Sequence, residues 1–255
     1  MEAERWGKAD LHIHSAAGDG IASPAEILEY VEYHTDLDLI AITDHDNLSG
    51  SMEARELAAR KGYRVQVVIG SEVTTTGGHL LCYGIEERIP MLRSLSYVVK
   101  LVHERGGFVI VPHPMSWLTI SVGERALRKA QASETDGLYF DGLEVINPAL
   151  AGRVTYSRLL QLNRQVLRLA ECAGSDSHSL DFLGTVYTRF PGCTVEDFRH
   201  ALHNRTTKAM GDFWGLEEYR QLSKIAGRQM FRSLILVPGQ HVQRALYSLL
   251  HRRAQ

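Results

Sequence analysis

The chain has 255 residues, of which 44% are hydrophobic and 23% charged, and its formal net charge is −2. These values are typical of a globular protein and exclude a disordered or collagen-like chain. No apolar run approaches the length of about 20 residues that spans a bilayer, and the polar residues 1–10 lead directly into a histidine motif without room for a signal peptide. We therefore expect a cytoplasmic protein.

The cysteine content argues against a disulfide-stabilised or Cys-rich zinc protein. Cys82, Cys172 and Cys193 are odd in number and far apart in the sequence. Neither a disulfide framework nor a Cys-x-x-Cys zinc site fits that spacing. We expect three unpaired thiols with structural roles.

Short apolar or β-branched runs alternate along the chain with longer amphipathic stretches. The predicted strands are residues 9–14, 37–43, 65–69, 79–83, 108–111, 142–146 and 167–173. Apolar residues at helical spacing predict helices at 23–34, 50–61, 92–105 and 151–165. This alternation is typical of a parallel sheet, and seven units without a Rossmann glycine fingerprint favour a closed or nearly closed α/β barrel.

The pattern changes after residue 212. Residues 219–255 contain seven Lys and Arg and no Asp or Glu. Their spacing predicts helices at 216–237 and 241–253, so we expect a barrel domain at 1–212 and a basic amphipathic helical tail at 213–255. We expect the tail to pack on the barrel or to form a homo-oligomer; contact with nucleic acid or an anionic membrane is the alternative.

Six histidines and three carboxylates lie near the ends of predicted strands. Side chains alternate along a strand, so His12 and His14 project from one face and can converge on one ion, and the same argument applies to Asp176 and His178. The nine candidate ligands are His12, His14, Asp19, His45, Glu72, His79, His113, Asp176 and His178. Nine is too many for one metal, so we expect two to three divalent ions.

The ligand types indicate which ions these are. Imidazole and carboxylate ligands without cysteine suit Mn, Fe or Zn. Paired metals clamp the attacking and leaving oxygens of a hydrolysis and need a bridging carboxylate. Glu72, which follows the predicted strand 65–69, is our candidate for that bridge.

These motifs resemble the PHP family, named for polymerase and histidinol phosphatase domains. The resemblance covers about residues 8–212 and is carried by Asp10-Leu-His-Ile-His-Ser15 with Asp19, Thr43-Asp-His-Asp46, Gly70-Ser-Glu72, His113-Pro114 and Gly174-Ser-Asp-Ser-His178. It implies a distorted (β/α)7 TIM-like barrel and a trinuclear metal centre. The first metal would be held by His12, His14, Glu72 and Asp176, the second by Glu72, His79 and His113, and the third by Asp19, His45 and His178.

The resemblance implies a metal-dependent phosphoesterase. We expect hydrolysis of a phosphate ester of a small metabolite or nucleotide by a hydroxide that bridges two metals, with every ligand except His79 counted as catalytic. Alternatives within this chemistry are a histidinol-phosphate-type phosphatase and an exonuclease. An amide or lactone hydrolase would usually need a modified lysine at a strand end, where this chain has none, and a non-catalytic metal-bound binding module is the last alternative.

Five further residues are expected to support the site. Asn147 and Arg153 follow the predicted strand 142–146 and are candidates for binding the substrate phosphate, although Arg153 could equally be an exposed helix residue. Asp10, Asp44 and Asp46 are candidates for orienting ligands from behind.

Overall fold

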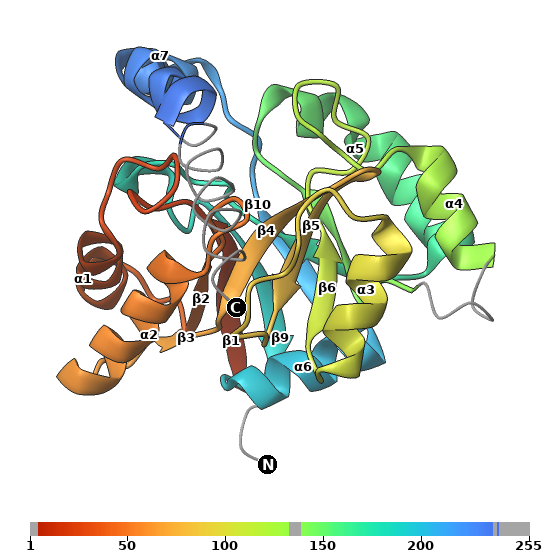
Figure 1. Ribbon diagram of the computed structural model, residues 1–255, viewed down its shortest axis with the longest axis horizontal. Helices are drawn as coiled ribbons and strands as arrows, with labels where there is room; N and C mark the ends of the chain where they lie inside the picture. The colour runs from red at the N-terminus through yellow and green to blue at the C-terminus, as the bar shows by residue number, and fades with distance from the viewer. Residues whose placement is uncertain (1–4, 133–138, 237–238, 240–255) are drawn as a thin grey trace, which may run out of the picture.

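The computed structural model describes residues 5–132, 139–236 and 239, and its strands form two five-stranded sheets (Figure 1). The first sheet has the order β10 (Lys208–Gly211), β9 (Val186–Pro191), β1 (Trp6–Ile13), β2 (Leu39–Ile42) and β3 (Gln66–Val67). The second has the order β4 (Gly70–Thr75), β5 (Gly78–Tyr83), β6 (Phe108–Val111), β7 (Gly142–Ile146) and β8 (Ala170–Ala173).

The expected seven parallel strands are wrong in number and in direction. β1, β2 and β3 pair in parallel, as do β6, β7 and β8, but β5, β9 and β10 pair antiparallel with their neighbours. Two single bridges connect the sheets, Ile13 with Ser177 and His45 with Glu72. Among the described residues the hydrogen-bonded strands therefore form two joined sheets and not one closed barrel, although the α/β class is confirmed.

The short connection between β4 and β5 explains why β5 runs antiparallel to β4. Only Thr76 and Gly77 join the two strands, and a loop of that length permits an antiparallel hairpin but no crossover helix. Glu72 consequently lies inside β4, a strand that the sequence analysis missed, and not in the loop after residues 65–69. His79, near the start of β5, lies opposite Thr74. It therefore reaches the same end of the sheet as the residues that follow the parallel strands.

Seven helices accompany the sheets in the described part of the chain. They are α1 (Pro24–His34), α2 (Ser49–Lys61), α3 (Leu95–Glu104), α4 (Glu124–Ala132), α5 (Leu150–Leu162), α6 (Val195–Asn204) and α7 (Leu216–Phe231). The five predicted helices within the described residues are confirmed, whereas α4 and α6 were not predicted. α1 begins where expected because Ser23 and Glu26 form a capping box and Pro24 occupies the first turn.

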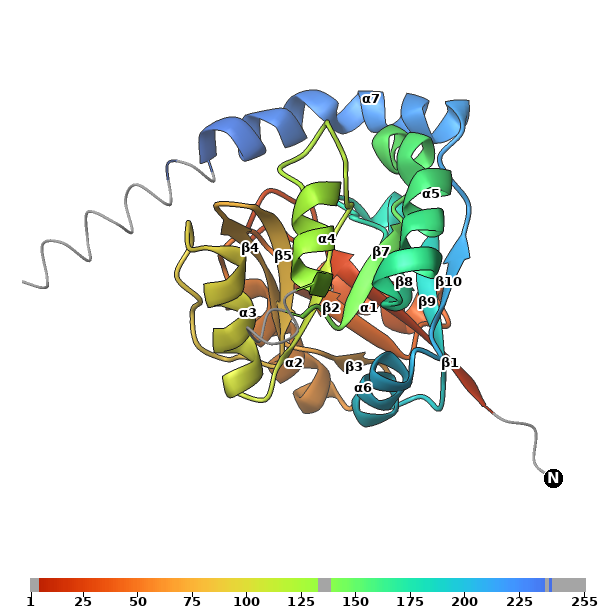
Figure 2. The same ribbon diagram turned by 90° about the vertical axis from the view of Figure 1, so that its right-hand side faces the viewer.

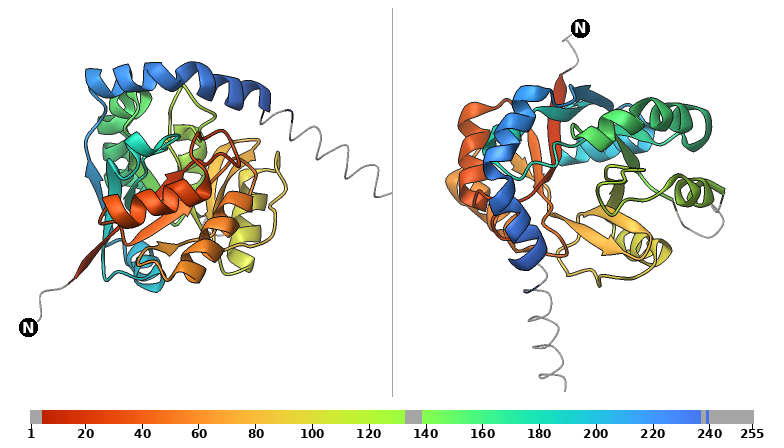
Figure 3. Two further views of the ribbon diagram at one scale, coloured as in Figure 1. Left: turned by 90° about the vertical axis from the view of Figure 1, so that its left-hand side faces the viewer. Right: turned by 90° about the horizontal axis from the view of Figure 1, so that it is seen from above.

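Three groups of buried side chains hold the layers together. One fills the space between the two sheets and includes Leu11, Leu39 and Phe198. The other two lie between the first sheet and α1 and α2, and between the second sheet and α3, α4 and α5. α6 covers one end of the sheets, and α7 runs across the opposite end (Figures 2 and 3).

The structure tests other sequence predictions only in part. Cys82, Cys172 and Cys193 are unpaired, as expected. α7 continues as a π-helical turn through Leu236, in agreement with the predicted helix 216–237. The second tail helix, 241–253, lies outside the described residues. Among the described helices, none combines the length and apolar character of a membrane span; the cytoplasmic location stays a prediction.

We expect Tyr83→Phe to lower the free energy of unfolding by about 1–2 kcal/mol, because the buried Tyr83 hydroxyl donates to the Leu11 carbonyl at 2.7 Å. This bond joins β5 of one sheet to β1 of the other, and the phenyl ring retained in the variant keeps its stacking on Phe108. Urea unfolding measures the change, with the exposed Tyr33→Phe as the control. Equal midpoints for the two variants would contradict the assignment.

Candidate metal centre

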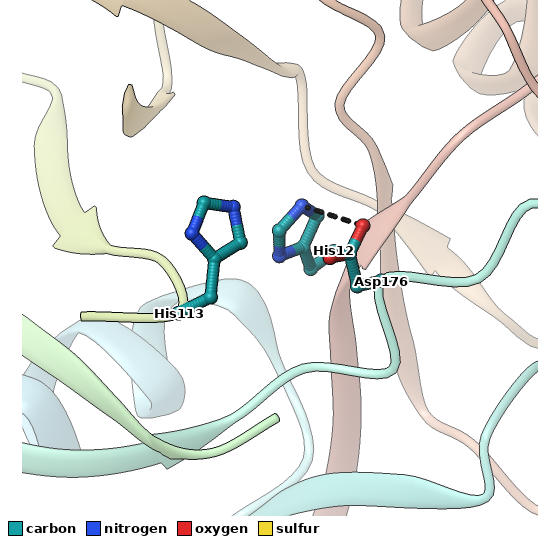
Figure 4. A group of neighbouring side chains, drawn as sticks. All are labelled: His12, His113 and Asp176. Atoms are coloured by element: carbon teal, nitrogen blue, oxygen red, sulfur yellow. Dashed lines mark ion pairs between the residues drawn. The ribbon is translucent and has the colours of Figure 1, made fainter. Parts of the chain in front are cut away.

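All nine predicted ligands converge at the end of the sheets that faces α7. Among the residues that the structure describes, their nitrogen and oxygen atoms form five overlapping groups of three, each with its ligand atoms within 4.8 Å of one another, and the union of these groups is the predicted set. Figure 4 shows three members, His12, His113 and Asp176, which come from separate segments and approach one another. These residues are far apart in the sequence, and the fold brings them together.

Glu72 lies at the centre of the group. Its Oε1 is 2.7 Å from His79 Nδ1 and 3.1 Å from His113 Nε2. Its Oε2 is 3.3 Å from the Nε2 atoms of both His12 and His14, and 3.4 Å from His45 Nδ1. The two oxygens of one carboxylate thus face different histidines, which is the arrangement needed for a bridging ligand.

Two further carboxylates extend the group on the side of His14. Asp176 Oδ1 is 3.4 Å from His12 Nε2 and 3.3 Å from His14 Nε2. Asp19 Oδ1 is 3.4 Å from His14 Nδ1, and Asp19 Oδ2 is 3.3 Å from His178 Nε2. His14 therefore lies between the Glu72–Asp176 pair and Asp19.

The chemistry of these atoms fits divalent cations. Both ring nitrogens of His14, Asp19 Oδ1 and His79 Nδ1 are buried and lie 2.7–3.4 Å from other candidate ligand atoms without the geometry of a hydrogen bond, within the described part of the chain. Buried polar atoms without well-formed hydrogen bonds cost free energy, and a cation shared between them removes that cost. Burial lowers the pKa of His45 to about 4, so its ring is neutral and able to bind a metal at physiological pH.

The charges at the centre of the group favour an ionised bridge. Burial raises the pKa of Glu72, but the opposing effects of His45, His79 and His12 hold it well below its usual range. The pKa of Asp176 is likewise low, because His12 and His14 outweigh the effect of burial. Both carboxylates are therefore available as anionic ligands.

Glu144 supports two ligands and was missed by the sequence analysis. This buried residue of β7 places Oε1 2.8 Å from His12 Nδ1, and its Oε2 accepts a hydrogen bond from the His113 backbone N–H at 2.9 Å. A carboxylate behind a ligand imidazole fixes the tautomer that turns Nε2 toward the metal. Gly174 makes room for it, since a Cβ there would lie 2.0 Å from Glu144 Oε1. A lone carboxylate within the buried strand Gly142–Ile146 was the signal in the sequence.

His113 is held by its own loop. Its Nδ1 is 2.8 Å from Ser121 Oγ and 3.1 Å from Thr119 Oγ1, so the ring is fixed with Nε2 toward Glu72. His113 and Asp176 both have left-handed backbone, with φ of 30° and 52°. Such conformations cost free energy in non-glycine residues and are typical of functional sites.

The three aspartates expected behind the ligands bind backbone and side-chain groups of the ligand loops. Asp10 accepts from the N–H groups of Ser175 and Gly184, and Asp44 accepts from the N–H and hydroxyl of Ser15. Asp46 accepts from the Thr74 N–H at 2.9 Å. Burial raises the pKa values of Asp10 and Asp44 to about 6. Asp10 and Asp44 therefore act on the ligands through the loops that they bind, whereas Asp46 contacts β4, the strand that carries Glu72.

The two residues expected to bind phosphate lie in different surroundings. Asn147 is buried, and its Nδ2 donates to Asp176 Oδ2 at 3.3 Å. Arg153 is exposed on α5 and does not line the cavity above the ligands. Asn147 is thus placed to orient a ligand, whereas phosphate binding by either residue stays a prediction.

A cavity of about 470 Å³ opens directly above the ligands. Its floor includes Glu72, Asp176 and His178, and its walls are mostly apolar, with Leu118, Ile120, Phe182, Trp214, Leu222 and Ile225. The volume falls within the range of about 300–1,000 Å³ that is usual for small-molecule sites. A second cavity of about 460 Å³, lined by His103 and Asp141, contains none of the nine ligands.

Comparison with known families identifies the family of this chain. The profile of the PHP domain matches residues 10–181, and that of a PHP-associated region matches residues 163–207. The chain belongs to the PHP domain family. Together with the ligand geometry, this membership supports a metal-dependent phosphoesterase and confirms the family predicted from the sequence motifs.

Several proteins resemble this PHP protein over parts of its length. An uncharacterised protein of Methanocaldococcus jannaschii is 35% identical over 55% of this chain and 81% of its own. A 5′-3′ exoribonuclease of Haemophilus influenzae is 27% identical over 60% of this chain and 50% of its own. A 3′,5′-nucleoside bisphosphate phosphatase of Chromobacterium violaceum is 36% identical over 32% of this chain and 30% of its own. The chain thus spans half or less of the two named enzymes.

A solved structure confirms the arrangement of the fold. A two-domain protein of Bacteroides vulgatus that contains a PHP-like metal-dependent phosphoesterase superposes with a TM-score of 0.66 at 20% identity. The match covers 91% of this chain and 71% of the other. At this identity the likeness establishes a shared fold.

We expect Glu144→Gln to weaken metal binding and turnover by about 10- to 100-fold, because the amide has only one accepting oxygen for His12 and the His113 loop. Metal content after dialysis, measured together with turnover, tests this. Glu171→Gln on the adjacent strand is the matched control, since Glu171 pairs with Arg164 away from the ligands. Wild-type metal content and turnover in Glu144→Gln would show that Glu144 has no positioning role.

Proposed function

We propose that this PHP protein hydrolyses phosphate monoesters of small metabolites of nucleotide size, with two to three Mn, Fe or Zn ions in a trinuclear site. The observation that carries the proposal is the central position of Glu72, whose two oxygens face different histidines. Asp176 and Asp19 complete three further groups of ligands beside it in the described part of the chain. When bound, the ions supply positive charge for the phosphate and an activated water for its hydrolysis.

The residues of the chain have separate tasks in this proposal. Glu72 would be shared by the first two ions. The first would be held by His12, His14, Glu72 and Asp176, the second by Glu72, His79 and His113, and the third by Asp19, His45 and His178. Glu144 keeps His12 in one tautomer, and Ser121 holds the ring of His113 in place. The apolar side chains Leu118 and Ile120 limit the access of bulk water to the reacting phosphate.

The cavity favours a small substrate. Its lining among the described residues contains no Lys or Arg, so the phosphate charge must be met at the floor, where the ligands lie. A long nucleic acid would need a basic groove for its backbone. Phe182 and Trp214 offer aromatic surface for a flat leaving group such as a nucleoside, and the bisphosphate phosphatase relative supports that choice.

The remaining alternatives differ in their requirements. An exonuclease, supported by the exoribonuclease relative, would have to admit the end of a polymer past α7. A histidinol-phosphate-type phosphatase fits the same cavity. An amide or lactone hydrolase usually employs a bridging lysine, and no lysine lines the cavity in the described part of the chain. A binding module would hold metal but hydrolyse none of these substrates, so a measurement of turnover distinguishes it from the enzymes.

We expect purified protein to contain two to three divalent transition ions per chain and to lose phosphatase turnover with chelator. Readdition of Mn²⁺, Fe²⁺ or Zn²⁺ should restore the turnover, because the buried carboxylates and imidazoles require a compensating charge. Elemental analysis measures the ions. Turnover is followed as phosphate release with nucleoside monophosphates, a 3′,5′-bisphosphate and histidinol phosphate, as nucleotide release with an RNA oligomer, and as amine release with an amide. At most one ion after reconstitution would contradict the trinuclear site, and turnover of the RNA oligomer alone would favour the exonuclease.

Glu72→Gln and Asp176→Asn should each lower turnover by about 100-fold or more while the fold is retained, since each removes a ligand charge worth several kcal/mol in the transition state. Steady-state kinetics with circular dichroism measures both effects. Asp181→Asn is the control, because Asp181 is exposed and close in sequence but outside the ligand groups. Near wild-type turnover in either ligand variant would refute the assignment.

We infer that the C-terminal segment also mediates self-association. Met230, Phe231, Leu234 and Ile235 are more than half exposed at the end of α7 and just after it, and exposed apolar groups of this kind favour a protein contact. Contact of the tail with nucleic acid or an anionic membrane is the alternative proposal. Light scattering at low and high salt separates self-association from binding to nucleic acid or an anionic membrane. Only binding to these anionic partners weakens steeply as the salt concentration rises.

A further inference from the structure

The C-terminal segment supplies no predicted metal ligand, yet it touches the metal centre directly. The Ser233 hydroxyl, in the turn that follows α7, donates to Asp19 Oδ2 at 2.7 Å. The adjacent Arg232 donates from one guanidinium nitrogen to the carbonyl oxygens of Ala16, at 2.6 Å, and Gly18, at 2.9 Å. Two consecutive residues thus hold both the carboxylate and the backbone of one ligand loop, more than 200 positions earlier in the chain.

The backbone of the Asp19 loop is held within the fold, where Asn47 Nδ2 donates to the Ala17 carbonyl. The residues next to Asp19 cannot hold its carboxylate in the same way. Asp19 lies between Gly18 and Gly20, and neither position has room for a side chain, since a Cβ would lie 2.6 Å from Asp44 Oδ1 or 2.1 Å from the His14 carbonyl oxygen. Ser233 restricts the rotation of the carboxylate, and Arg232 adds hydrogen bonds to two carbonyls of the loop.

The position of Asp19 matters for the other ligands. With Oδ2 held by Ser233 and close to His178 Nε2, Oδ1 remains 3.4 Å from His14 Nδ1 without a hydrogen bond. Rotation of the carboxylate would move both oxygens relative to His14, His45 and His178. Outer contacts that orient a ligand carboxylate commonly change metal affinity by about 10- to 100-fold.

α7 occupies the site in a second, independent way. Leu222, Ile225 and Gln229 of α7 line the same cavity as the ligands, and Figure 3 shows the helix crossing the end of the sheets where the ligands lie. The segment is therefore seated over the centre along its length and not only at Ser233.

We propose that Ser233 and Arg232 are positioning residues for Asp19, and that the C-terminal segment thereby completes the third group of metal ligands. The proposal rests on the proposed function only in taking Asp19 as a metal ligand. It assigns the basic tail a part in the assembly of the centre, in addition to any role in self-association.

The test is a calorimetric titration of chelator-stripped, full-length protein with Mn²⁺. Ser233→Ala and Arg232→Gln should lose one binding event, or weaken one by about 10- to 100-fold, whereas Ser233→Thr, which keeps the hydroxyl, should bind as the wild type does. Ser223→Ala and Arg228→Gln are matched controls on α7, where Ser223 donates to the Arg220 carbonyl and Arg228 is exposed. Both controls should leave all binding events unchanged.

The outcomes separate this inference from the proposed function. Wild-type titrations in both Ser233→Ala and Arg232→Gln would overturn the positioning role, as would equal losses in the two controls. Wild-type protein that binds Mn²⁺ but releases no phosphate would refute the proposed substrate class and leave the inference standing. Wild-type protein that binds none of Mn²⁺, Fe²⁺ and Zn²⁺ in such titrations would overturn both. Circular dichroism confirms that each variant is folded before its titration is interpreted.

Discussion

One carboxylate determines the arrangement of this site. Glu72 is buried, 1% exposed, and its two oxygens approach five imidazoles from four separate segments. A buried carboxylate is tolerated only when charge or hydrogen bonds compensate for the loss of water. The fold must therefore bring β1, the segment after β2, β5 and the loop after β6 to the same point, and the two sheets meet where His45 bridges to Glu72.

The antiparallel hairpin is what allows this convergence. In a parallel sheet only the residues after each strand reach the functional end. Because β5 runs opposite to β4, its first residues reach that end too, and His79 lies diagonal to Glu72 on one face. The reversal thus adds a histidine to the centre without an additional crossover helix. The departure from a regular barrel is part of the way the site is built.

The sequence predicted the ligands better than the strands that carry them. Period-two spacing identified His12 with His14, because side chains on one face of an extended segment share a direction. The same argument is wrong for Asp176 and His178, which lie beyond the end of β8 at Ala173, where Asp176 has left-handed backbone. β4 was missed because Gly70, Ser71 and the threonines at its end interrupt any apolar run, although the strand is almost wholly buried. Glu144 was missed although its strand was predicted, because a single carboxylate in an apolar strand gives no periodic signal.

Long-range contacts lie beyond any local pattern. Ser233 and Arg232 are separated from the Asp19 loop by 214 to 216 positions, and the basic, amphipathic character of residues 216–236 predicts a helix but not what it covers. The same contacts change how the tail is understood. A segment that appeared separate from the chemistry closes the cavity with Leu222 and Ile225 and holds a ligand carboxylate.

The charge balance of the site connects these features. Asp19, Glu72, Asp176 and Glu144 gather four carboxylates in a buried volume, and no Lys or Arg lines the cavity above them in the described part of the chain. Arg232 is close, but its guanidinium is directed to backbone carbonyls. The imidazoles compensate part of this negative charge, and divalent cations would compensate the remainder and also attract an anionic substrate. Because the cavity lining has no fixed positive charge in the described part of the chain, a phosphate can bind there only when the metals are bound. Substrate binding therefore depends on metal binding.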